Sequence, residues 1–250
     1  MALMKTSNPA LNRMDVAQDG QIMDAESAMT LQGTINKTGV LFILLAISSA
    51  LTWNMFKSDP TGMAMPIAMV AAIGGFIVAL VTIFKKDWAG FTAPLYAILE
   101  GLFLGATSAL FEVRYHGIAI EAVGLTFGTL LAMLIAYSSG LIRPSENFKM
   151  GIVAATGGIA LLYLATILLG FFGVQIPYIY GNGPIGIAFS LFVVGLAALN
   201  LVLDFDLIES AVAARAPKYM EWYGAFGLMV TLIWLYLEML RLLAKINSRD

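Results

Sequence analysis

The stretch from Asn200 to Glu209, NLVLDFDLIE, closes an apolar run that begins near Pro184. A bilayer core of about 30 Å is crossed by about 20 apolar residues in a helix, and this run is long enough. Two aspartates, Asp204 and Asp206, therefore lie near the end of a predicted membrane-spanning helix. A carboxylate in such a place is costly, which makes it a candidate for a functional site.

The composition of the whole chain is also typical of a membrane protein. Of its 250 residues, 60% are hydrophobic and 12% are charged, whereas soluble domains carry about 25% charged residues. The absence of cysteine excludes disulfides and thiolate metal sites. His116 is the single histidine, which argues against a catalytic triad or a multi-histidine metal site. A net charge of −2 offers no basic surface for nucleic acid.

Seven apolar stretches are long enough to span a bilayer. They are predicted at Thr38–Phe56, Met63–Phe84, Trp88–Phe111, Ile118–Ser139, Met150–Phe172, Ile185–Ser210 and Trp222–Ile246. The predicted fold is an all-α membrane protein, a seven-transmembrane helix bundle over residues 36–246. A flexible cytoplasmic tail is expected at 1–35, which lacks the apolar core of a signal peptide, and a short tail at 247–250. An aromatic and glycine-rich loop, suited to the membrane interface, is expected at Val174 to Pro184.

The distribution of lysine and arginine predicts a cytoplasmic N-terminus. On that reading the inner segments hold nine basic residues and the outer loops two, Lys57 and Arg114. The nine are Lys5, Arg13, Lys37, Lys85, Lys86, Arg143, Lys149, Arg215 and Lys218. The seventh span would leave Arg241, Lys245 and Arg249 outside, against the rule. A re-entrant last segment is the alternative, and seven full spans are preferred.

Asn200 and Asp204 are four residues apart and share one helix face. Asp206 is rotated by about 200° from Asp204 on an ideal helix, so both cannot point at one ligand without local unwinding. Asp204 lies deeper and is favoured as functional, whereas Asp206 and Glu209 are typical of a solvated helix end. The level of the last helix that faces Asp204 holds Gly227, Val230 and Thr231.

Glu100 lies near the middle of the third span and shares a face with Phe103, Leu104 and Thr107. An ionised carboxylate cannot face lipid there, so Glu100 should face the bundle or be protonated. Two interpretations stay open: a protonated glutamic acid bonded to a neighbouring helix, or a carboxylate that serves an ion.

The other acidic residues in or near the spans are given structural interpretations. Glu238 precedes Arg241 by three residues, which predicts an ion pair on the helix surface near the outer interface. Glu112 and Glu121 are expected in water at span ends.

Small residues predict where helices approach closely. Gly101 and Gly105 form a GxxxG pattern, and Ala154 with Gly158 forms the looser version of it.

At LYAILEGLFLGATS, LNLVLDFDLIES and GLMVTLIWLYLEMLRLLAKI the chain resembles the transmembrane Bax inhibitor motif family, specifically its bacterial Bax-inhibitor-like membrane proteins. The resemblance covers about Asn36 to Ile246. It implies a seven-helix bundle with a central last helix, set in the bacterial inner membrane, that acts as a pH-sensitive calcium leak channel. The family's sensor is a pair of aspartates, one near the end of the sixth helix and one in the seventh. Asp204 matches the first, but no aspartate occurs in the seventh span, so Asp206, Glu100 or a water network would have to substitute.

The leading hypothesis is therefore a calcium leak gated by protons. Asp204 and Asp206 are the expected proton sensor, with Glu100, Asn200 and Thr107 in the ion pathway. Calcium prefers six to eight oxygen ligands, and Asp204 with Glu100 would supply carboxylates for it. Calcium is the expected cargo, no cofactor is expected, and the expected partners are the lipid bilayer and calcium.

The alternative is a non-transporting regulator or scaffold of other membrane proteins, in which the acids serve helix packing. An intramembrane enzyme is not expected, because no span carries histidine, HExxH is absent and no GxGD surrounds the aspartates. A retinal protein is not expected, because the seventh span has no lysine at mid-depth for a Schiff base.

Overall fold

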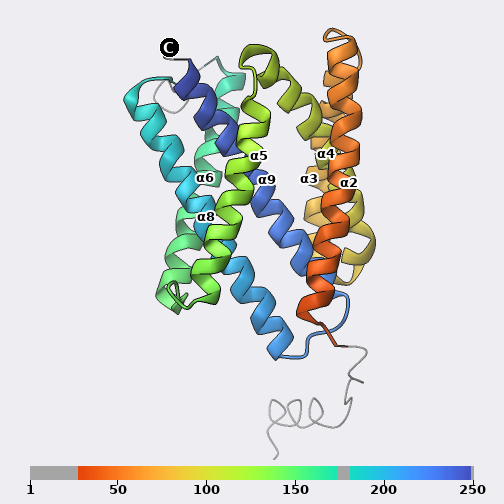
Figure 1. Ribbon diagram of the computed structural model, residues 1–250, viewed down its shortest axis with the longest axis vertical. Helices are drawn as coiled ribbons and strands as arrows, with labels where there is room; N and C mark the ends of the chain where they lie inside the picture. Colours follow the sequence, from red (N-terminus) through yellow and green to blue (C-terminus); the bar gives the residue numbers. More distant parts are fainter. Residues whose placement is uncertain (1–27, 174–180, 249–250) are drawn as a thin grey trace, which may run out of the picture.

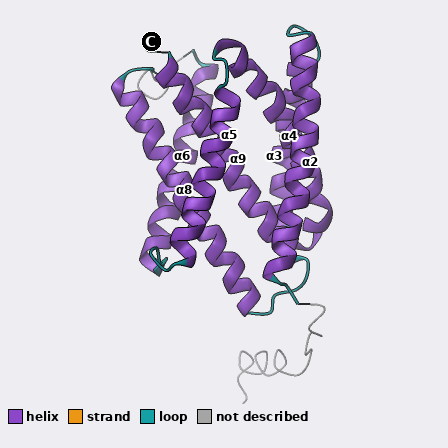
Figure 2. Cartoon of the chain, in the orientation of Figure 1, coloured by secondary structure: helices purple, strands orange, loops and turns teal. Residues whose placement is uncertain are grey.

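The structure, a computed structural model, describes residues 28–173 and 181–248. Within these ranges the chain forms helices joined by turns, with one isolated backbone bridge between Ala28 and Pro217 (Figures 1 and 2). The elements are α2 (Leu31–Ser58), α3 (Ala64–Phe84), the short 3₁₀ helix η1 (Lys86–Trp88), α4 (Ala89–Arg114), α5 (Ile118–Ser138), α6 (Glu146–Phe171), α8 (Pro184–Ala213) and α9 (Met220–Asn247). Residues 1–27 of the predicted tail, residues 174–180 of the predicted interface loop, and residues 249–250 lie outside the described residues.

Seven of the described helices are long and apolar enough to cross a membrane, which confirms the predicted all-α fold. Successive long helices run in opposite directions, and the C-terminus lies at the end of the bundle opposite to the start of α2 (Figure 1). The last helix therefore crosses the whole bundle, as the preferred interpretation predicted. Below, the end where α2 begins is the lower end, and the end where α2 finishes is the upper end.

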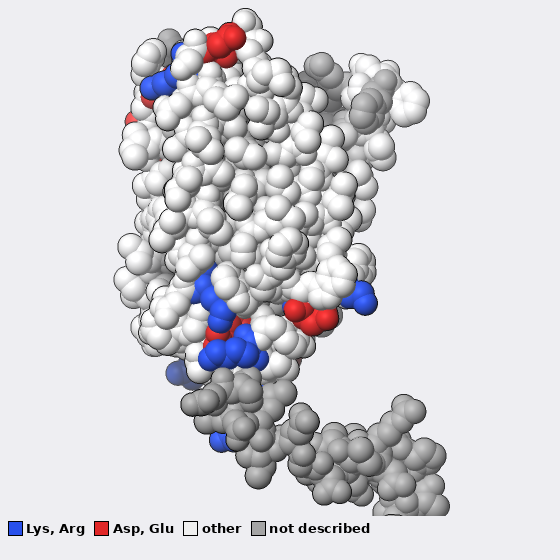
Figure 3. All heavy atoms as spheres, turned by 90° about the vertical axis from the view of Figure 1, so that its right-hand side faces the viewer, with Lys and Arg blue, Asp and Glu red and all other residues white. Residues whose placement is uncertain are grey.

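Charged side chains gather at the two ends of the bundle. On the face shown in Figure 3, lysine, arginine, aspartate and glutamate lie at the upper and lower ends, with an uncharged belt between them. Together with the seven apolar helices, this belt identifies an integral membrane protein.

The helix α9 is the centre of the bundle, as expected. It packs against α2, α4, α5 and α8, and 56% of its most apolar stretch is buried, against 44% or less in the other six spans. Met229 belongs to the core shared with α2 and α4, whereas Leu235 and Leu240 belong to the core shared with α5 and α8. Apolar side chains around the whole circumference let α9 bury opposite faces at once.

The GxxxG pattern marks the α2–α4 crossing, as predicted. Gly101 lies against Ser48 and the Leu45 carbonyl of α2, and Gly105 against the Ser49 carbonyl, so a Cβ at either glycine would overlap α2.

The second small-residue pattern does not mark a helix contact. Ala154 and Gly158 are exposed, and a Cβ at Gly158 would meet nothing within 4 Å. The prediction of close packing there was wrong, because among the described helices only α8 packs closely on α6. One face of α6 is thus left toward the surrounding membrane.

The described part of the predicted tail is folded. Helix α2 begins at Leu31, two turns before the predicted span. The Thr30 hydroxyl accepts a hydrogen bond from Gly33 N at 3.0 Å and caps the helix. Met29 N donates to Ala216 O at 2.7 Å, so residues 28–30 lie along the loop between α8 and α9.

Candidate functional site

Asp204 lies in the lower third of α8 and faces α9. A Cβ placed on Gly227 would lie 3.8 Å from Asp204 Oδ1, and the Thr231 side chain hydrogen-bonds the same carboxylate. Helix geometry had predicted these two neighbours. The second oxygen, Oδ2, is buried and has no hydrogen-bond partner among the described residues. Such an unpaired polar atom is rare in folded proteins and calls for a ligand, a water or a functional reason.

Asn200, one turn away on the same face, joins α8 to α6. Its Nδ2 donates to Thr156 Oγ1 at 2.8 Å and to Leu196 O at 2.9 Å. The shared face of Asn200 and Asp204 is therefore the face that α8 turns toward α6 and α9.

Asp206 does not join Asp204. It forms an ion pair with Lys149 of α6, with an N–O distance of 2.7 Å, and Lys149 also pairs with Glu146 at 3.1 Å. Glu209 accepts a hydrogen bond from the Tyr137 hydroxyl of α5. The two aspartates point to different helices, as their rotation predicted, so the proposed sensor pair Asp204–Asp206 is not assembled in this structure.

Glu100 is half-buried on α4 and faces α3. A Cβ on Gly75 of α3 would lie 2.8 Å from Glu100 Oε1. Thr107 lies on the same helix and is also half-buried. Helix α4 packs against α2, α3 and α9, and α9 separates it from α8.

The predicted calcium site of Asp204 and Glu100 therefore needs correction. The two carboxylates occupy different helix interfaces, and an anion's partner is set by the helix it faces, which spacing along the chain does not give. Among the described residues, no group of three His, Cys, Asp or Glu side chains is placed to hold a metal ion.

Glu238 is a buried carboxylate that sequence reasoning placed on the helix surface. Its ion pair with Arg241 exists, with Nη1–Oε1 at 2.7 Å. However, only 1% of the residue is exposed, and the Tyr163 hydroxyl of α6 donates to it at 2.8 Å. The available signal was its place inside an otherwise apolar helix, which favours a bundle-facing position.

These contacts line up along the interface of α6, α8 and α9, and we call them the polar row. Helix direction orders them from the lower to the upper end. They are Lys149–Asp206, Asp204–Thr231, Asn200–Thr156, Tyr163–Glu238–Arg241 and Ser190–Lys245. Val193 and Leu196 of α8 are buried beside the row and pack with Ile152 and Ile159 of α6. The apolar cluster closes the row against water between Asn200 and the upper end.

Glu221 was missed by sequence reasoning. It has 0% exposure, and its carboxylate binds Lys37, Lys218 at 3.1 Å, and both N and Oγ1 of Thr30 at 2.9 Å. The sequence gives no signal for it, because its partners come from the other end of the chain. All its oxygens are engaged, so Glu221 serves to fix the N-terminal segment onto α9.

Comparison with known proteins places this arrangement in a family. The model of the Bax inhibitor 1 like family matches residues 8–248. A phospho-N-acetylmuramoyl-pentapeptide-transferase of Rippkaea orientalis is 25% identical over 170 residues, which are 64% of this chain and 46% of that protein. The chain thus spans less than half of the length of that relative. The family match includes all seven spans together with Asp204 and the central α9, so the chain belongs to the Bax inhibitor 1 like family.

Proposed function

We propose that this protein is a passive calcium leak whose conduction falls when Asp204 is protonated. The observation that supports the proposal is the buried Oδ2 of Asp204, which has no hydrogen-bond partner among the described residues. An ionised carboxylate in this position has lone pairs available to a cation, and a proton competes for the same atom.

The polar row supplies the route. Calcium exchanges six to eight oxygen ligands readily, and beside Asp204 it would meet the Thr231 hydroxyl and water. Farther up, the Thr156 hydroxyl and the Glu238 carboxylate offer oxygens. A site with one carboxylate is suited to passage, because weak binding allows the ion to leave.

The described conformation is the closed one. Val193 and Leu196 are buried in the apolar cluster with α6, and an ion cannot cross such a contact without water. Helix α6 packs closely on α8 alone among the described helices, so it is the element whose displacement would open the row.

Acidification should lower the flux, because a protonated Asp204 is neutral and no longer attracts calcium. Flux into proteoliposomes that contain a calcium dye, measured between pH 6 and 8, tests this. Asp204→Asn should reduce flux by about ten-fold or more and abolish its pH dependence, since a lost charged hydrogen-bonding group is worth about 1.5–3 kcal/mol. Glu100→Gln is the matched control, an intramembrane acid outside the row, and should keep the wild-type pH profile. Wild-type flux in Asp204→Asn would count decisively against the proposal.

Thiol labelling tests the route independently, because the chain has no native cysteine. Thr231→Cys and Thr156→Cys should react with a charged methanethiosulfonate reagent under conditions that support flux, and calcium should slow the reaction. Thr126→Cys on α5, buried away from the row, should stay unreactive. Equal rates at all three positions would show that the row is not the aqueous path.

The proposal includes the bacterial inner membrane with the N-terminus in the cytoplasm. The lower end holds seven of the described basic residues and the upper end four, which is the bias expected for a cytoplasmic lower end. Lipid and calcium are its proposed partners, without nucleic acid, cofactor or catalytic step. The transferase match covers part of both chains and does not bring that activity here. No flux from purified protein, together with a stable partner in a pull-down, would favour a non-transporting regulator.

A further inference from the structure

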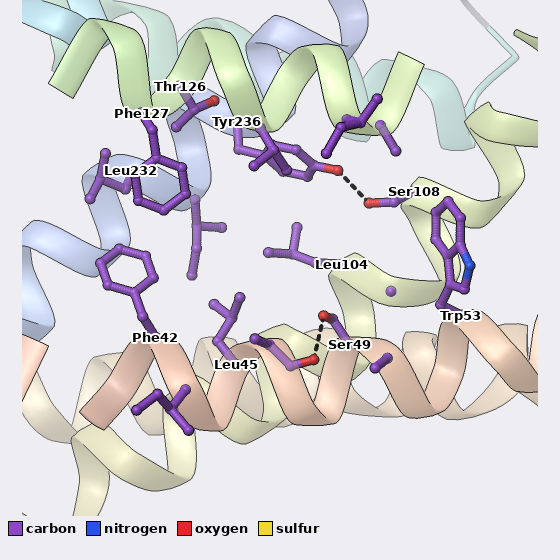
Figure 4. Close-up of a pocket in the computed structure, with 18 residues that line it drawn as sticks. Phe42, Leu45, Ser49, Trp53, Leu104, Ser108, Thr126, Phe127, Leu232 and Tyr236 are labelled. Carbon is purple, nitrogen blue, oxygen red and sulfur yellow. Dashed lines mark hydrogen bonds between the residues drawn. The ribbon is translucent and has the colours of Figure 1, made fainter. Parts of the chain in front are cut away.

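A groove of about 640 Å³ lies between α2 and α5, on a different side of α9 from the polar row. Helices α2 and α5 form its walls, and α4 and α9 form its floor (Figure 4). We call it the α2–α5 groove. Its volume falls in the range of small-molecule binding sites, about 300–1,000 Å³.

The groove offers nothing to water. The hydroxyls of Ser108 and Tyr236 share a hydrogen bond of 2.7 Å on its floor (Figure 4). Thr126 Oγ1 donates to Ala122 O at 2.7 Å and Ser49 Oγ to Ala46 O at 2.9 Å. A buried water needs two to four polar partners, and the hydroxyls that line the groove are already bonded within the protein. The occupant must therefore be apolar.

The length and depth of the groove match one leaflet of a bilayer. The rings of Phe42 and Phe127, 5.7 Å apart, close one end, and Trp53 lies at the other (Figure 4). Phe42 and Trp53 are eleven residues apart on α2, about 16 Å along a helix, which is about half of a hydrocarbon core of 30 Å. The groove thus runs from mid-membrane to the upper interface.

The sides and the upper end of the groove indicate what enters it. Ile43 and Ile120, which line the mouth, are 61% and 72% exposed, so the mouth opens toward acyl chains. At the upper end, Lys57 Nζ lies 5.2 Å from the centre of the Trp53 ring. A cation at the interfacial end of an apolar groove is complementary to a lipid phosphate.

We propose that the α2–α5 groove binds one acyl chain of a phospholipid from the upper leaflet, with the phosphate beside Lys57. A partner helix, about 10 Å across, does not fit, because the Phe42–Phe127 contact bridges the two walls. The bound chain fills a space that α2 and α5 leave between them. This site is independent of the proposed calcium leak.

Native mass spectrometry of the full chain, released from nanodiscs that contain anionic and zwitterionic phospholipids, tests the site. The wild type should retain one phospholipid after mild delipidation. Ala46→Phe, which fills the groove from α2, should lose it. Ile47→Phe is the matched control, because Ile47 is 59% exposed and lies outside the lining, and it should keep the adduct. Lys57→Gln should reduce the preference for anionic phospholipid by about five-fold, the effect of about 1 kcal/mol per lysine.

Val123→Trp fills the groove from the α5 wall and serves if Ala46→Phe does not fold. Loss of the adduct in either filling variant, with retention in Ile47→Phe, supports the site. An adduct that persists in the folded filling variants, no adduct in the wild type, or an adduct that is not a phospholipid would overturn the proposal.

Discussion

Asp204 and Glu221 are carboxylates buried by neighbouring helices, and their partners distinguish them. Glu221 is surrounded by Lys37, Lys218 and the cap residue Thr30. Asp204 has Thr231 on one oxygen and no described partner on the other. A fully paired buried charge holds structure together, whereas a half-paired one is free to exchange ligands. This difference supports a functional role for Asp204 and a structural role for Glu221.

Replacing Glu221 by glutamine should destabilise the protein. The change leaves Lys37 facing a neutral amide in a buried site, and breaking a buried pair costs about 3–5 kcal/mol. Thermal unfolding followed by circular dichroism in detergent should show a large fall in Tm. Glu146→Gln removes a pair whose acid side chain is 88% exposed and should change stability by less than about 1 kcal/mol. Equal Tm values for the two variants would refute the anchoring role.

At the scale of helices, α4 and α6 show two ways in which a span meets its neighbours. Helix α4 is enclosed by α2, α3 and α9, and its glycines let α2 approach closely. Helix α6 contacts α8 by one face, through the apolar cluster and the polar row. Both sequences are equally apolar to the eye, so their different burial follows from their place in the bundle.

Gly101→Ala and Gly158→Ala should therefore differ. The added methyl at Gly101 would overlap Ser48 and the Leu45 carbonyl, and overpacking costs about 1–3 kcal/mol. At Gly158 the methyl enters open space, and stability should not fall. Unfolding midpoints of the two variants, measured in the same detergent, check this. A lower midpoint for Gly158→Ala than for Gly101→Ala would contradict the assigned packing.

At the scale of the molecule, alternating helices put the start of α2 and the end of α9 at opposite ends of the bundle (Figure 1). Every loop is thereby assigned to one of two ends, and one experiment fixes the orientation of all of them. The basic residues favour a cytoplasmic lower end.

Single cysteines at exposed serines test that orientation. Ser58→Cys lies at the upper end and Ser139→Cys at the lower end, both exposed and both conservative changes. In intact cells, an impermeant maleimide should label Ser58→Cys, and should label Ser139→Cys only after the membrane is permeabilised. The reverse pattern would invert the proposed topology.

The seven spans, the central last helix and the α2–α4 crossing could be predicted from the sequence. Apolar length and small-residue spacing are local properties, and the bilayer imposes them on each segment separately. The orientation of Asp204 toward Gly227 and Thr231 also followed, because rotation along one helix is regular. The family resemblance agreed with the matched family model.

The partners of the charged groups were not predictable in this way. Glu100 meets α3, Glu238 meets Tyr163 of α6, and Glu221 meets Thr30 and Lys37 from the start of the described chain. Each pairing depends on which helices become neighbours when the bundle assembles, and apolar spans of similar length do not encode that choice locally. Packing of the assembled helices selects the neighbours, and with them it determines which buried acid is left with an unpaired oxygen.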